Sequence, residues 1–252
     1  MTQNEPIPRK IHYCWYGNAP VSDLGRRCIQ TWRETMPQYS VEAWDERRLP
    51  ATSPYAKIAY RQKKFAFVAD YMRLQILYQE GGIYLDTDVE VVRPFDELLD
   101  QSLFFGLQSP GSVGVSVIGA TKGHPFLLTV LEALDREASS GRPAFQPLPE
   151  LVTAMVASAA GDVPKLFDED YFYPYNPYSP VPVKRKPLQS NMSERTFCVH
   201  HWEGTWLGGM SLRMMVALRL KDVMRKAQAG LHPSRASDLT RAGSTAKSSG
   251  RD

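Results

Sequence analysis

Two aspartates separated by one threonine, Asp86 and Asp88, follow a short apolar run and are the strongest candidates for chemistry in this sequence. In extended chain, alternate side chains point to the same side, so both carboxylates are expected on one face. Apolar residues before and after the pair indicate a largely buried setting, where two unpaired carboxylates are unfavourable. A hard divalent cation, Mg²⁺ or Mn²⁺, takes oxygen ligands and often keeps positions for the phosphates of a substrate. The pair therefore predicts a metal site that holds a diphosphate.

A second polar pair, Asp70 and Arg73, lies three residues apart on one face of a predicted helix, among apolar neighbours. One interpretation is an ion pair within the helix, which contributes only about 0.2–0.5 kcal/mol. The other is a polar patch that contacts the hydroxyls and charges of a substrate. The residues alone leave both interpretations open.

Histidine and tryptophan supply further candidates. His200 and His201 are adjacent near the end of a predicted strand, so they point to opposite faces and at most one of them reaches a given site. An imidazole is a suitable third ligand beside two carboxylates. Trp15 follows another strand and either packs in the core, which its residue type favours, or stacks on a nucleobase. For His12 and His124, structural roles are expected.

The elements that must position these residues alternate between strands and helices. We expect strands within 7–17, at 39–44, 82–85, 103–107 and 113–119 and from 196, and helices over 22–36, 56–80, 125–137, 149–159 and 212–226. Gly81 is expected to end the long helix with a positive φ angle. This order predicts an α/β fold, in which ligands collect at the carboxyl ends of the strands.

Composition narrows the class of protein. The chain has 252 residues, 43% of them hydrophobic and 11% aromatic, which suits one domain with a substantial core. Three cysteines show no metal-type spacing, no apolar run reaches the ~20 residues that span a bilayer, and no secretory signal is evident. A cytoplasmic protein without a nucleic-acid partner is the expectation.

Charge is distributed unevenly along the chain. Residues 211–252 contain nine Lys/Arg and three Asp/Glu, a balance of +6, so with a total of +3 residues 1–210 carry −3. We expect one domain over residues 1–227 and a disordered basic tail over residues 228–252. The basic amphipathic helix at 212–226 either lies on the anionic inner face of a membrane or packs on the domain with a solvated basic face, and the second alternative is the more common one.

The segment FAFVADYMRLQILYQEGGIYLDTDVEVV, residues 65–92, resembles the glycosyltransferases with a D-x-D sugar-binding motif, family 32. That family includes bacterial capsular-polysaccharide transferases and fungal α-mannosyltransferases, and is distantly similar to the clostridial glucosylating toxins. The segments IPRKIHYCWYG and CIQTWRETMPQYSVEAWDE are also similar to the opening of the family. The resemblance implies a GT-A fold with a mixed sheet flanked by helices, a UDP- or GDP-sugar donor, a Mn²⁺ or Mg²⁺ ion and retention of the anomeric configuration. The acceptor it implies is a hydroxyl group of a glycan or glycolipid.

Residue by residue, the resemblance implies that Asp86 and Asp88 hold the metal and the donor. It implies that Asp70 and Arg73 contact the donor sugar and the diphosphate, and that Tyr84 lines the donor pocket.

At the two ends of the chain, the resemblance implies that Trp15 stacks on the base and that His201 is the C-terminal metal ligand. It places Trp206 beside the leaving diphosphate.

Two rival functions stay open. The run LDTDVEV also fits the strand motif of haloacid-dehalogenase-like phosphohydrolases, in which Asp86 would attack phosphorus, although the motif comes late in the chain and no convincing second acidic pair follows. The other rival is a sugar-binding module that has the fold without the activity.

Overall fold

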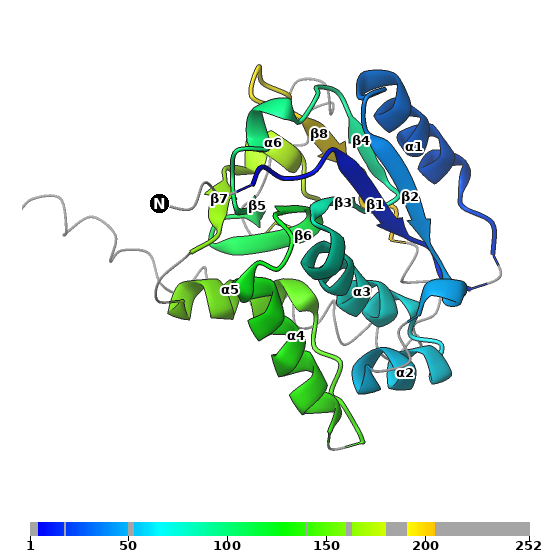
Figure 1. Cartoon of the computed structure of the whole chain (residues 1–252). Coiled ribbons are helices and arrows are strands. Elements are labelled where there is room, and N and C mark those ends of the chain that lie inside the picture. Colours follow the sequence, from blue (N-terminus) through cyan, green and yellow to red (C-terminus); the bar gives the residue numbers. More distant parts are fainter. Residues whose placement is uncertain are drawn as a thin grey trace, which may run out of the picture. The chain divides into compact units, whose positions relative to one another are not determined.

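The computed structural model describes residues 5–17, 19–49, 53–139, 141–159, 163–179 and 191–204. Its main feature is a six-stranded mixed sheet of order β2-β1-β3-β6-β5-β7, and a two-stranded antiparallel ribbon of β4 and β8 accompanies it (Figure 1). The helix predicted at 212–226, the tail predicted at 228–252 and Trp206 lie outside the described residues. No helix in the described ranges is long and apolar enough to cross a bilayer.

The first half of the sheet is parallel. Strands β1 (Lys10–Cys14) and β2 (Ser40–Trp44) pair in parallel, and α1 (Asp23–Thr35) connects them. Ser22 caps α1 by accepting a hydrogen bond from the backbone N–H of Gly25, as expected for an N-cap serine. Strand β3 (Gly82–Leu85) then pairs in parallel with β1, so β1, β2 and β3 end at the same edge of the sheet.

The long helix predicted over residues 56–80 is two helices, α2 (Pro54–Arg61) and α3 (Phe65–Glu80). The chain breaks at Lys63, whose φ is 55°. The N–H of Lys63 donates to the carbonyl of Tyr60, and the N–H of Lys64 donates to that of Ala59. These two bonds form a Schellman motif, which usually carries glycine at the left-handed position. A lysine there gives no sequence signal, which is why the prediction of one helix is wrong.

Glycines form the entry to β3 as predicted. Gly81 ends α3 with φ 65°, and Gly82 follows with φ 105°. A side chain at Gly82 would place its Cβ 2.8 Å from the carbonyl oxygen of Lys10. Both positions therefore require glycine, because of backbone conformation and because strand β1 lies so close.

The second half of the sheet is mostly antiparallel. Strands β5 (Leu103–Ser109) and β6 (Ser112–Ala120) form the predicted hairpin, β6 pairs antiparallel with β3, and β7 (Lys165–Phe167) pairs in parallel with β5. Helices α4 (Pro125–Ala138) and α5 (Leu148–Ser158) match the predicted helices within a residue. The tyrosine-rich segment after β7 begins with the short helix α6 (Glu169–Phe172). Two 3₁₀ turns, η1 (Glu46–Arg48) and η2 (Asp96–Leu98), complete the elements before β5.

Two hydrophobic clusters lie on the two faces of the sheet. One joins the side chain of Tyr84 on β3 to helices α2, α3, α4 and α5. The other joins the side chains of Ile83 and Leu85, which point to the opposite face, to α1, α6 and the β4–β8 ribbon. The predicted class, an α/β fold with a mixed sheet flanked by helices, is confirmed.

Candidate metal and donor site

A turn between the two sheets brings Asp86 and Asp88 together. The N–H of Val89 donates to the carbonyl of Asp86 at 3.0 Å, which closes a turn through Thr87. Strand β4 (Val89–Val91) then leaves the large sheet and joins the small ribbon. The expectation of an extended segment with both carboxylates on one strand face is therefore wrong. The two side chains lie close because the chain reverses between them.

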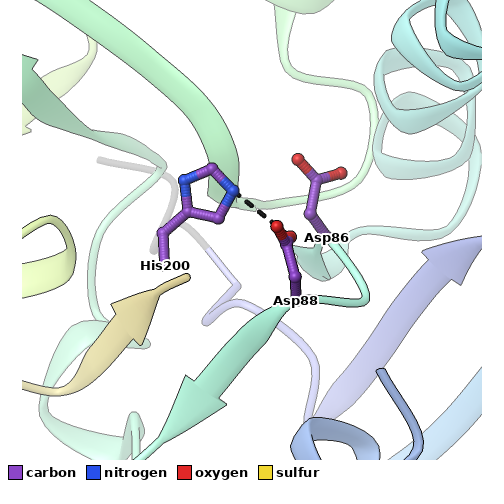
Figure 2. Close-up of side chains that lie close together, drawn as sticks. All are labelled: Asp86, Asp88 and His200. Atoms are coloured by element: carbon purple, nitrogen blue, oxygen red, sulfur yellow. Dashed lines mark ion pairs between the residues drawn. The ribbon is translucent and has the colours of Figure 1, made fainter. Parts of the chain in front are cut away.

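His200 is the third member of the cluster. It ends β8 (Cys198–His200) and pairs across the ribbon with Val89, the residue after Asp88. Its Nε2 lies 3.2 Å from Oδ1 of Asp88, and a ligand atom from each of Asp86, Asp88 and His200 lies within 4.8 Å of the others (Figure 2). Figure 2 shows the imidazole facing Asp88, with Asp86 beside it. Two carboxylates and an imidazole form a donor set that suits a divalent metal ion.

His201, the histidine expected at the metal, lies elsewhere. Its N–H donates to the carbonyl of Asp88, while its Nε2 lies 2.8 Å from Oε2 of Glu90. The structure thus corrects the choice between the two adjacent histidines. Of the two adjacent imidazole rings, only that of His200 lies at the aspartates, because the register of the ribbon pairs His200 with Val89.

Arg73 contacts one carboxylate of the cluster, that of Asp86, and the neighbouring carboxylate of Asp70. Its guanidinium is 3.0 Å from Oδ1 of Asp70 and 3.3 Å from Oδ1 of Asp86, and it donates to the carbonyl of Val115 at 2.7 Å. Nε donates to the carbonyl of Ala69, so each guanidinium nitrogen has an acceptor. The Asp70–Arg73 pair is therefore an ion pair within the helix, as one interpretation expected, but a buried one that extends to Asp86.

Burial and charge act in opposite directions on these carboxyl groups. Burial raises the pKa of Asp70 to about 6, Arg73 opposes the rise, and the charge of Asp86 adds to it. Burial also tends to raise the pKa of Asp88, but hydrogen bonds and charge from His200, together with the N–H of Glu203, hold it below its usual value. Arg73 contacts the carboxylates of Asp70 and Asp86, and Asp88 contacts His200, so the acidic groups here outnumber the guanidinium and a bound cation would balance the excess negative charge.

Tyr84 and Trp15, both expected to contact the donor, differ in position. Tyr84 is buried, its hydroxyl donates to Oδ1 of Asp86 at 2.9 Å, and its ring lies against the Arg73 guanidinium. This position suits a residue that holds the Asp86 carboxylate in place better than one that lines a donor pocket. Trp15 is half-buried, and its indole N–H donates to the carbonyl of Ala19 at 2.7 Å. The predicted stacking of the Trp15 ring on the base of the donor stays untested.

A bulge in β6 supports the cluster and was missed in the sequence. Register changes between Phe105 and Gly106 leave Val115–Val117 without partners on β5. The freed backbone groups serve the site: the carbonyl of Val115 accepts from Arg73, and that of Ser116 accepts from the N–H of Asp86. The Ser116 hydroxyl lies 3.4 Å from Nε2 of His200. Bulges commonly redirect groups beside active sites.

The hydroxyl of Tyr173 fills that bulge. It accepts hydrogen bonds from the N–H groups of Ser116 and Val117, and its ring packs edge-on against His200. A Cβ at Gly114 would lie 2.4 Å from the tyrosine ring, so this glycine makes room for it. In the sequence, the only signs of this contact are the glycine on β6 and the distant tyrosine-rich segment. Nothing in the sequence indicates that the two lie together, because the fold alone brings them into contact.

Trp202 holds the other side of the His200 ring. Its ring centroid lies 4.3 Å from that of His200, and its indole N–H donates to the carbonyl of Tyr175. Its φ is 58°, a left-handed conformation that is uncommon for an aromatic residue and typical of strained functional sites. Within the described ranges Nδ1 of His200 has no hydrogen-bond partner. The ring is therefore fixed by packing, with Nε2 directed at the aspartates.

Comparisons with known proteins agree with the resemblance. Residues 22–105 match the family model for the glycosyltransferase sugar-binding region containing a DXD motif. Inositol phosphoceramide mannosyltransferase 3 of Schizosaccharomyces pombe is 36% identical over 144 residues, which cover 54% of this chain and 39% of that protein. Mannosyl phosphorylinositol ceramide synthase CSH1 of Saccharomyces cerevisiae is 30% identical over 136 residues, covering 51% of this chain and 35% of that protein.

Among solved structures, PaToxG glycosyltransferase aligns with a TM-score of 0.49 and 20% identity over 61% of this chain and 70% of that one. The chain spans about two fifths of the length of the curated relatives named above. Asp86 and Asp88 fall inside the matched region, so the similarity to the glycosyltransferase sugar-binding region includes the candidate metal site.

Proposed function

We propose that this protein is a metal-dependent glycosyltransferase that moves a sugar from a nucleotide-sugar donor to a hydroxyl acceptor with retention of configuration. The observation that carries the proposal is the convergence of Asp86, Asp88 and His200 within 4.8 Å, inside the region that matches the DXD family model. The cluster contains more carboxylates than cations, so it favours a bound dication and, through it, a diphosphate.

The side chains fit a metal ion by their chemistry. Asp86 and Asp88 offer carboxylate oxygens and His200 offers an imidazole nitrogen. Carboxylates suit both Mg²⁺ and Mn²⁺, whereas an imidazole ligand favours the transition metal, so Mn²⁺ is the better candidate. When bound, such an ion would act as a Lewis acid on the departing nucleoside diphosphate.

The protein's own residues set the geometry of this reaction. Arg73 and the Tyr84 hydroxyl hold Asp86 from beneath, so the carboxylate is oriented before a ligand arrives. We assign Arg73 to this positioning, because its nitrogens are already occupied. Asp70 is buried beside it and is the candidate for hydroxyls of the donor sugar. Attack by the acceptor on the face that the diphosphate leaves, with the leaving phosphate taking the proton, needs no separate protein base.

The names of the relatives indicate the first substrates to test. Both are named for mannosyl transfer to inositol phosphoceramide or its derivative. We therefore propose a mannosyl nucleotide as the first donor and a glycolipid or glycan hydroxyl as the acceptor. A cytoplasmic location, peripheral to the inner face of a membrane, goes with this proposal.

A donor-hydrolysis panel tests the proposal. The purified protein is incubated with UDP- and GDP-sugars, with Mn²⁺ or with a chelator, and released nucleoside diphosphate is measured. We expect release that needs the metal and is lost in Asp88→Asn. A phosphohydrolase would instead form an aspartyl phosphate at Asp86 and release orthophosphate. A sugar-binding module would bind a donor without turnover.

A further inference from the structure

Helix α2 presents one face to the other helices and a basic face away from them. Tyr55, Ala56 and Ala59 are buried against the cluster that contains α3 and α4. Lys57, Tyr60 and Arg61, at helical spacing i, i+3 and i+4, are exposed. Lys63 follows in the Schellman motif and is exposed as well. We call Lys57, Tyr60, Arg61 and Lys63 the α2 basic surface.

The α2 basic surface carries three cations, Lys57, Arg61 and Lys63. Among the residues that the structure describes, none forms an ion pair with Lys57, Arg61 or Lys63, whereas Arg47 pairs with Asp45. Residues 47–69 contain six Lys/Arg and no Asp/Glu, although residues 1–210 together carry −3. The positive charge of the domain is thus concentrated on α2 and its flanks. Such a patch attracts anionic partners and is attenuated by salt.

The surface is also hollowed and partly apolar. A hollow of about 200 Å³ is lined by Leu49, Ala56, Lys57, Tyr60 and Arg61. The Tyr60 side chain, 36% exposed, is one of the large hydrophobic residues that reach solvent. Tyrosine combines an apolar ring with a polar tip and is favoured at membrane interfaces, and Lys and Arg can keep their charged ends among phosphates there. A cation at the end of a helix also interacts with the helix dipole, but that effect involves Arg61 alone.

The position of the surface relates it to the candidate metal site. The Tyr60 ring lies 5.8 Å from that of Phe65, and a Cβ at Gly17, in the loop after β1, would lie 3.0 Å from the Phe65 ring. Strand β1 is parallel to β3, whose end leads into Asp86. In Figure 1, α2 lies below α3, on the side of the molecule towards which the β1 and β2 arrows point. The α2 basic surface and the aspartates therefore belong to the same edge of the sheet.

We propose that the α2 basic surface docks on an anionic phospholipid bilayer, with headgroup phosphates at Lys57, Arg61 and Lys63 and with Tyr60 at the boundary of the acyl region. Charge complementarity and the exposed aromatic residue together select a lipid surface over a soluble anion. Docking by this surface would bring the edge of the sheet that leads into Asp86 near the bilayer. The sugar acceptor would then be a molecule held in the membrane. Only this statement about the acceptor rests on the proposed function.

The test compares two triple variants of the full chain with equal loss of charge. Lys57→Gln/Arg61→Gln/Lys63→Gln removes the α2 cations. Arg27→Gln/Arg33→Gln/Lys122→Gln removes three exposed cations elsewhere and is the matched control. Co-sedimentation is measured with phosphatidylcholine vesicles, and with vesicles that contain about one third phosphatidylglycerol, a strongly anionic surface. Circular dichroism verifies that both variants fold.

We expect the wild type to bind the anionic vesicles only, and less at high salt. The α2 variant should partition at least about tenfold more weakly, since each cation near such a surface contributes about 1 kcal/mol, while the control should change by less than about threefold. Tyr60→Ala should weaken binding with charge intact. The basic segment 211–252 is common to all variants and cancels in the comparison.

Three results would overturn the proposal. Equal losses in both triple variants would show that only total charge matters. Unchanged binding in the α2 variant would place the contact elsewhere. Unchanged vesicle binding with a raised KM for nucleotide-sugar hydrolysis would assign the surface to a soluble substrate. Vesicle binding needs no turnover, so a wild-type protein that binds the anionic vesicles but hydrolyses no donor would contradict the proposed function alone, and one that hydrolyses a donor without binding vesicles would contradict the docking proposal alone.

Discussion

Two regions of this molecule each bury a histidine, and the two rings differ in what their nitrogens contact. His12 lies in β1, where one ring nitrogen is 3.0 Å from the carbonyl of Gly81 and the other accepts from the indole N–H of Trp44. His200 is held by aromatic rings, faces Asp88 with Nε2, and has no partner at Nδ1 in the described part of the chain. A ring bonded to protein groups at both nitrogens indicates a structural role, whereas the position of His200 beside Asp86 and Asp88 makes its ring a candidate ligand.

The largest expected effect comes from removing the negative charge of Asp88, the carboxylate that contacts His200. Asp88→Asn should lower metal-dependent donor hydrolysis by about 10²–10³-fold, since a metal-stabilised leaving group accounts for several kcal/mol of the barrier. Thermal stability should fall as well, because contacts with His200 and the N–H of Glu203 hold the pKa of Asp88 low and so stabilise the fold at neutral pH; the loss of hydrolysis is therefore measured below the melting transition of the variant. Glu90→Gln, which changes a neighbouring acid that pairs with His201, is the control. Equal loss in both variants would contradict the assignment.

Exchanging the adjacent histidines tests the register of the ribbon directly. His200→Gln should weaken Mn²⁺ binding by at least about tenfold, the lower range for a lost contact near a metal. His201→Gln should leave the affinity within about twofold, because that ring contacts Glu90. Isothermal titration with Mn²⁺ measures both. A larger effect at His201 would restore the ligand that the family resemblance implies.

Substitution of His12 is expected to lower the stability of the fold and to leave metal binding unchanged. His12→Leu would leave the Gly81 carbonyl and the Trp44 indole N–H without partners, at a cost of about 2–4 kcal/mol in the free energy of unfolding. Chemical denaturation measures this loss, and Mn²⁺ titration of the folded variant should match the wild type. A drop in Mn²⁺ affinity would remove the distinction between the two regions.

Tyr173→Phe sharpens the comparison from the aromatic side. The change removes the acceptor for the N–H groups of Ser116 and Val117 and keeps the ring against His200. We expect a loss of about 1–3 kcal/mol in stability with a modest decrease in Mn²⁺ affinity, since the bulge also holds Asp86. Tyr171→Phe, a change of the same kind on α6, is the control. If only stability changes, the bulge does not shape the metal site.

The smallest effect concerns pH. Burial lowers the pKa of His12, so the unfolded chain binds more protons than the fold between the lowered pKa and the ordinary value near 6.5. His12 therefore stabilises the fold above that range, and the contribution is lost as pH falls through it. Melting temperatures measured between pH 7 and pH 5 should decrease less in His12→Leu than in the wild type. Parallel decreases would show that other groups dominate.

The sequence predicted what local residues determine. The Gly81 cap, the strand that follows and the hairpin of β5 and β6 are all found. The turn through Thr87, the choice of His200 and the bulge filled by Tyr173 depend on strands that meet only in the fold. No periodicity of neighbouring residues encodes the register of β4 against β8, so the adjacent histidines could not be told apart. The break before α3 was not predicted because Lys63 occupies a left-handed position that usually carries glycine.

The turn at Thr87 joins two separate bodies of β-structure. Asp86 is anchored to the six-stranded sheet through Ser116, whereas Asp88 is anchored to the ribbon through His201 and Glu203. The spacing of the two acids is therefore an inter-sheet distance. A small displacement of the ribbon would change the separation of the two carboxylates while every hydrogen bond inside the larger sheet stays intact.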